Sequence, residues 1–112
     1  GDGPAECFNY TMASLAVTDA FIAQRPQDAA RIVSAMKDTH AALKKDPALA
    51  AVIGRKVFPE REAALIQTLI ERDLPYYATE ISSPFVAGMN EFARKRGILK
   101  GNPAYESIVA LP

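Results

Sequence analysis

Apolar positions recur every three or four residues through most of the chain, which is the spacing that places side chains on one face of an α-helix. The longest run of this kind predicts a helix over about 26–45. We expect its apolar stripe to face a core, because an amphipathic helix buries its apolar side. The stripe consists of Ala29, Ile32, Val33, Met36, His40 and Leu43.

The same spacing predicts further helices, over about 19–24, 47–53, 59–74 and 84–96. Gly54 is expected to end the helix that begins at Pro47, because glycine adopts the left-handed conformation without steric cost. The helix over 84–96 should end at Gly97, with Ile98 folding back on its last turn. That helix is expected to bury a face formed by Phe85, Met89, Phe92 and Ala93.

Proline and N-cap residues mark the expected helix starts. Proline suits the first helical position, because the N–H that it lacks would have no intrahelical partner there. Thr18 is the expected N-cap of the first short helix, and Asp46, Ser83 and Asn102 have the same role before three of the prolines. The five prolines at expected starts are Pro26, Pro47, Pro59, Pro84 and Pro103.

One segment, Phe8 to Val17, reads as a strand, and no second strand follows it. A lone strand leaves backbone donors and acceptors unpaired, so it needs partners from elsewhere. We therefore predict a mainly α chain in which residues 1–112 form a single partial domain. Self-association is the simplest cover for the strand, and a homo-oligomer is expected. The expected contact is either the backbone edge of that segment or a set of its side chains: Phe8, Tyr10, Met12 and Leu15.

Composition limits the classes of function that fit the chain. With 112 residues, of which 49% are hydrophobic, the chain can bury one core but not two. The 13 basic and 13 acidic residues cancel, which gives no reason to expect nucleic acid as a partner. No apolar run approaches the ~20 residues of a membrane span, and no segment within the chain reads as an export signal.

Catalytic chemistry is not expected from these residues. His40 and Cys7 are the only histidine and cysteine, and neither has neighbours at metal-ligand or thiolate-activating spacing. No serine sits in a nucleophile-elbow context of glycines. We expect no enzyme activity, no catalytic or metal-binding residues and no cofactor. The basic cluster of Arg94, Lys95 and Arg96 suits the negative end of a helix, although a phosphate patch is the alternative reading.

Two places carry side chains suited to ligand contact. Asn9, Tyr10 and Thr11 offer amide and hydroxyl groups on the expected strand. Tyr76 and Tyr77 follow Pro75 in the expected linker over 76–82, where two amphipathic rings could line a cleft or a protein contact. Ordinary packing is the alternative role for both groups.

Several segments resemble the C-terminal part of the substrate-binding protein of an ABC importer. The segments are Tyr10-Thr11-Met12-Ala13, the run from Thr18 to Pro26, the alanine-rich start of the long helix, and Met89 to Arg94 leading to Gly97-Ile98-Leu99. More narrowly, the chain is similar to the nitrate-, sulfonate- and taurine-binding group and to the related binders of thiamine pyrimidine precursors. The resemblance extends from about Phe8 to Val109.

The resemblance implies a C-terminal fragment of a two-lobed α/β periplasmic-binding-protein fold of type II. Residues 8–17 would be a hinge strand and the remainder the terminal helices, while the lobe-forming βα units would precede residue 1. It also implies a small-molecule ligand between the lobes, ABC permease subunits as partners, and a periplasmic or lipid-anchored extracytoplasmic location. Two alternatives remain: a free-standing helical protein-interaction module that self-associates, and a pyrimidine-precursor-forming enzyme of the related family.

Overall fold

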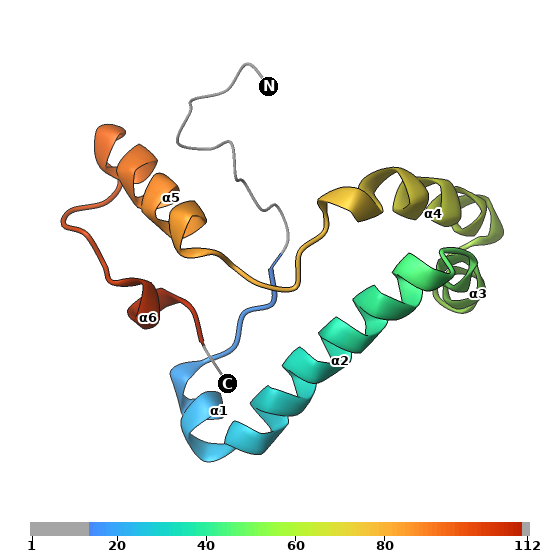
Figure 1. Cartoon of the computed structure of the whole chain (residues 1–112), viewed down its shortest axis with the longest axis horizontal. Helices are drawn as coiled ribbons and strands as arrows, with labels where there is room; N and C mark the ends of the chain where they lie inside the picture. Colours follow the sequence, from blue (N-terminus) through green and yellow to red (C-terminus); the bar gives the residue numbers. More distant parts are fainter. Residues whose placement is uncertain (1–13, 111–112) are drawn as a thin grey trace. The chain divides into compact units, whose positions relative to one another are not determined.

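The computed structural model describes residues 14–110, and every regular element in that range is helical (Figure 1). The prediction of a mainly α chain is therefore confirmed. The elements are α1 (Asp19–Gln24), α2 (Pro26–Lys45), α3 (Ala48–Val57), α4 (Glu60–Asp73), the 3-10 helix η2 (Leu74–Tyr76), α5 (Ser83–Lys95) and α6 (Tyr105–Ile108).

The predicted strand is absent where the structure describes it. Residues 14–17 have no regular structure, and their side chains are exposed. The strand prediction is thus wrong for this stretch, because none of the described segments supplies a backbone edge with which it could pair. The rest of the predicted strand, residues 8–13, lies outside the described residues.

The first two helices begin where local signals place them. The Thr18 hydroxyl accepts a hydrogen bond from the Phe21 amide at 3.1 Å, which satisfies one open donor in the first turn of α1. α2 begins at Pro26 and ends at Lys45, as predicted. Its apolar stripe, however, is only partly buried: Ala29 is buried and Met36 is 54% exposed, while the other stripe residues are half-buried. The helix pairs that pack together are α3 with α4 and α5 with α6, and α2 belongs to neither pair.

The described residues fall into two compact units, one over 27–79 and the other over 14–26 together with 80–110. The unit over 27–79 contains the hairpin of α3 and α4 (Figure 1). Small residues line the contact between these helices: Ala51, Gly54 and Ala63 are buried. Small side chains allow two helix backbones to approach closely, so this contact depends on the absence of bulk.

Gly54 does not end α3, and the prediction that it would is wrong. α3 continues to Val57, and Gly54 accepts a hydrogen bond from the Phe58 amide at 2.8 Å. A Cβ atom at Gly54 would lie 2.7 Å from Ile66 Cδ1 of α4. The glycine is therefore used for close helix packing, and the chain leaves the helix at Phe58, just before Pro59.

Several helix starts differ from the prediction by one or two residues. Pro47 and Pro59 precede α3 and α4 as N-caps and are not their first residues. Ser82, not Ser83, caps α5, and its hydroxyl accepts from the Phe85 amide at 3.3 Å. Asn102 and Pro103 do not begin a helix, because α6 starts at Tyr105. The Asn102 side chain instead accepts a hydrogen bond from Arg94 Nη1 at 2.7 Å, so a tertiary contact replaces the predicted cap.

In the other unit, hydrogen bonds connect α5 and the residue just before its N-cap with α6 and the segment that leads to it. Asn90 is buried, and its Nδ2 donates to the Pro103 carbonyl at 3.1 Å. The Tyr105 hydroxyl donates to the Ile81 carbonyl. α5 buries Val86 and Asn90, whereas the predicted face of Phe85, Met89 and Phe92 is half-buried. The segment 101–105 contacts α5 at Asn90. The side of α5 that is buried therefore differs from the side that carries most of its apolar residues.

Candidate functional site

A shallow depression opens in the unit over 27–79, where several chain turns meet. Its volume is about 210 Å³, and it is lined by Lys44, Pro47, Glu71, Leu74 and Pro75. These residues come from the end of α2, the turn before α3, the last turn of α4, and η2. Pockets for drug-sized ligands usually reach about 300–1,000 Å³, so this one suits a single side chain or a small organic group.

Local turn chemistry shapes the depression. The Asp46 carboxylate accepts from the Ala48 amide at 3.1 Å and so stabilises the turn that places Pro47 before α3. On the opposite side, the Tyr77 amide donates to the Leu74 carbonyl at 3.1 Å and closes the 3-10 turn containing Pro75. Two proline rings and the buried Leu74 thus give the depression an apolar lining.

Charges of opposite sign stand among the lining residues. Glu71 accepts a hydrogen bond from Gln67 Nε2 at 2.8 Å, which holds the carboxylate on the surface of α4. Lys44 supplies the ammonium group, near the end of α2. The arrangement can bind an apolar group that carries polar ends, but these five side chains include neither a nucleophile nor an imidazole base.

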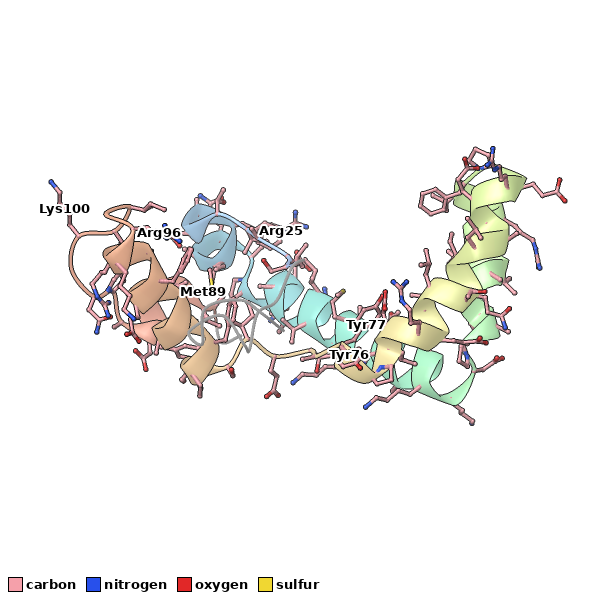
Figure 2. All side chains as sticks on the ribbon, turned by 90° about the horizontal axis from the view of Figure 1, so that it is seen from above. Arg25, Tyr76, Tyr77, Met89, Arg96 and Lys100 are labelled. Atoms are coloured by element: carbon pink, nitrogen blue, oxygen red, sulfur yellow. The ribbon has the colours of Figure 1, made fainter. Side chains whose placement is uncertain are left out.

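Tyr76 and Tyr77 follow Pro75 directly, and Figure 2 shows both at the end of the α4–η2 segment. Tyr76 is 86% exposed and Tyr77 is 43% exposed. Neither ring is among the residues that line the depression. The other predicted contact residues, Asn9, Tyr10 and Thr11, lie outside the described residues, and so does Cys7.

An exposed ion pair lies next to this region. Arg72 donates to both carboxylate oxygens of Asp73, at 2.6 and 2.7 Å. These bonds lower the pKa of Asp73 below its ordinary value and raise the pKa of Arg72. Since the folded pKa of Asp73 is lowered, any stabilisation is present at neutral pH and is lost as the pH falls through that pKa. The pair is solvent-exposed, so its effect is small.

His40, on α2, has a buried ring nitrogen. Its Nε2 has no hydrogen-bond partner among the described residues. Leaving such an atom unpaired costs about 1–3 kcal/mol. We expect His40→Leu to raise the thermal midpoint by a few degrees, because it removes the polar atom while retaining bulk. His40→Gln, which keeps a polar group, is the control; equal midpoints for the two variants would contradict this account.

Residues 14–110 contain neither a metal-binding cluster nor a membrane-spanning helix. In that range no three His, Cys, Asp or Glu side chains are arranged to hold a metal ion. None of the described helices has the length and apolar character needed to cross a membrane. The basic cluster lies at the end of α5, with Arg94 and Lys95 in the last turn and Arg96 as the C-cap, which fits complementation of the helix dipole.

The sequence predicted ligand contact at Tyr76 and Tyr77, which do not line the depression, and it did not predict the depression itself. The nearest signals in the sequence are Pro47, at an expected helix start, and Pro75, which directly follows the helix expected over 59–74. Nothing in the sequence indicated that Lys44 and Glu71, 27 positions apart, line the same space.

Comparison of the chain with known proteins identifies no relative. No family model matches the chain, and neither the curated proteins nor the solved structures contain a significant match. The resemblance to binding proteins of ABC importers therefore rests on the sequence segments quoted above.

Proposed function

We propose that the chain is the helical C-terminal portion of the substrate-binding component of an ABC importer. The observation that carries the proposal is the uncovered apolar surface of its helices. Within residues 14–110, the buried apolar residues are Ala29, Ala51, Ala63, Leu74 and Val86. Larger apolar side chains remain exposed on the hairpin: Leu49, Val52, Ile53, Val57, Phe58, Leu65 and Leu69.

Four of these exposed side chains lie on one side of the hairpin. Ile53 and Val57 are one turn apart on α3, as are Leu65 and Leu69 on α4. Helical geometry places all four on the same side of the hairpin, because Ala51, Gly54 and Ala63 fix which sides of the two helices meet. An exposed apolar face of this kind usually packs against another surface. In a two-lobed binding protein, the α/β lobes would supply that surface for the terminal helices.

In this proposal the chain contributes structure more than ligand chemistry. The lobes would close over a small molecule by hinge motion and present it to a permease, and no bond would be made or broken. Closure requires higher affinity for the ligand in the closed state than in the open state. The helices described here would stabilise a lobe, and Asn9, Tyr10, Thr11, Tyr76 and Tyr77 are the proposed contributors to ligand contact.

The test uses the natural gene product with whatever coding sequence precedes Gly1. Hydroxyl-radical footprinting would compare side-chain oxidation in that product and in the 112-residue chain. We expect Ile53, Leu65 and Leu69 to be several-fold less reactive in the longer product, because a lobe covers them. We also expect taurine, nitrate or an aminopyrimidine to raise its melting temperature.

Two results would contradict the proposal. One is an upstream reading frame without alternating strand and helix patterns, and the other is equal oxidation of the hairpin residues in both proteins. Ile98 provides an internal control, since it is 78% exposed outside the hairpin and has no part in the proposed ligand contact, so it should react similarly in both proteins.

A self-associating helical interaction module is the second candidate, and the same exposed face favours it. The two candidates differ in what covers Ile53 and Leu65: a second copy or a lobe. Sedimentation of the 112-residue chain at micromolar concentration separates them. A discrete dimer whose hairpin residues are protected from oxidation would favour the module.

A further inference from the structure

The loop that follows α5 presents one apolar side chain among several cations. Residues 94–100, here called the Ile98 loop, contain Arg94, Lys95, Arg96 and Lys100, and no acidic residue occurs between Glu91 and Glu106. The Ile98 side chain is 78% exposed. Figure 2 shows Arg96 at the end of α5 and Lys100 extending away from the ribbon.

The backbone of this loop is well defined by hydrogen bonds. Gly97 has a positive φ of 71°, its amide donates to the Arg94 carbonyl, and the Ile98 amide donates to the Ala93 carbonyl. This is a Schellman motif, in which the residue after the glycine usually packs on the last helical turn. Here the backbone folds back as predicted from Gly97, but the Ile98 side chain points to solvent.

Other contacts keep the loop in place and leave cations on its surface. Arg94 is tied to Asn102, and Lys95 forms a 3.0 Å ion pair with Glu91. Arg96 stacks over the Phe92 ring at 5.5 Å, and its side chain is exposed, as is that of Lys100. Arg96 and Lys100 therefore flank Ile98 on a preorganised loop.

We propose that the Ile98 loop is a docking site for an anionic lipid bilayer surface. An apolar side chain in front of cations matches the order of layers in a bilayer, where acyl chains lie beneath anionic headgroups. Ile98 enters the acyl boundary, while Arg96 and Lys100 stay among the phosphates. An apolar protein pocket fits less well, because closing over Ile98 would desolvate the neighbouring cations.

The expected affinity is weak and strongly dependent on salt. Each cation near an anionic surface contributes about fivefold to the partition coefficient, and burial of one aliphatic side chain contributes about tenfold or more. The Debye length falls from about 10 Å at 0.1 M salt to about 3 Å at 1 M, so binding should be largely lost at high salt. This proposal does not depend on the proposed transport function.

Vesicle co-sedimentation of the full chain tests the proposal, with phosphatidylglycerol–phosphatidylcholine vesicles against pure phosphatidylcholine. We expect binding to the anionic vesicles only, reduced about tenfold by Ile98→Ser and by Lys100→Glu. The matched controls are Val57→Ser and Lys56→Glu, which change an exposed apolar residue and an exposed cation on α3. Both controls should bind as the parent chain does.

Several outcomes would overturn the proposal. Equal binding to neutral vesicles, equal losses in the α3 controls, or no binding at low salt would each do so. Binding to soluble polyglutamate but not to vesicles would assign the loop to an acidic macromolecule instead. Circular dichroism of each variant confirms that the helices are retained, and the exposed positions of Ile98 and Lys100 favour this.

Discussion

Gly54→Leu is expected to destabilise the α3–α4 hairpin by about 3 kcal/mol, the upper end of the usual cost of overpacking. Even the first side-chain atom at this position would lie 2.7 Å from Ile66 Cδ1 and 3.7 Å from the Ala63 backbone. A leucine adds further atoms in the same direction, so the two helices must separate. Chemical denaturation followed by circular dichroism measures the loss.

A graded series makes this prediction specific. Gly54→Ala should be close to neutral, because the Ile66 side-chain end can rotate away and alanine gains about 1 kcal/mol of helix propensity. Ala64→Leu also introduces a leucine, with one added carbon fewer, on the exposed side of α4, and it should have little effect. If Ala64→Leu and Gly54→Leu cost the same, the close contact at Gly54 does not stabilise the hairpin.

Asn90→Ala is expected to destabilise the contact between α5 and the segment leading to α6 by about 2 kcal/mol. The change removes the donor to the Pro103 carbonyl and leaves that carbonyl unpaired in a part-buried position. Because the chain has two compact units, the effect should be local to one of them. Hydrogen exchange measured by mass spectrometry should show faster exchange in peptides covering 83–108 and unchanged exchange over 48–73.

Asn102→Ala is the matched control for Asn90. It also removes one side-chain hydrogen bond in the same loop, to Arg94, but both partners are exposed. Exposed hydrogen bonds exchange readily with water, so the cost should be below about 0.5 kcal/mol. Equal exchange rates in the two variants would show that the buried amide of Asn90 has no special role.

Local signals predicted most helix starts because N-caps and prolines act within one turn. Thr18 and Pro26 mark the first residues of α1 and α2 as the structure has them, since satisfying open N–H groups requires only neighbouring atoms. Ser83 was one residue off because Ser82 offers the same hydroxyl, and the entry angle of the chain decides which one is used. Phe92 was predicted to be buried but is half-buried. The segment containing Pro103 instead contacts α5 at Asn90, through the hydrogen bond from Asn90 Nδ2 to the Pro103 carbonyl.

The sequence by itself determined that this protein is mainly helical, where α1 and α2 begin, and that Gly97 ends α5, since each depends on contacts within a few residues. Tertiary structure decided that Gly54 serves close packing, that Asn102 holds Arg94, and that Lys44 and Glu71 line one depression. Glycine permits both a left-handed turn and close helix contact, so only the position of Ile66 selects between them. Burial of a residue likewise depends on which segments pack against it, and periodicity along the chain does not contain that information.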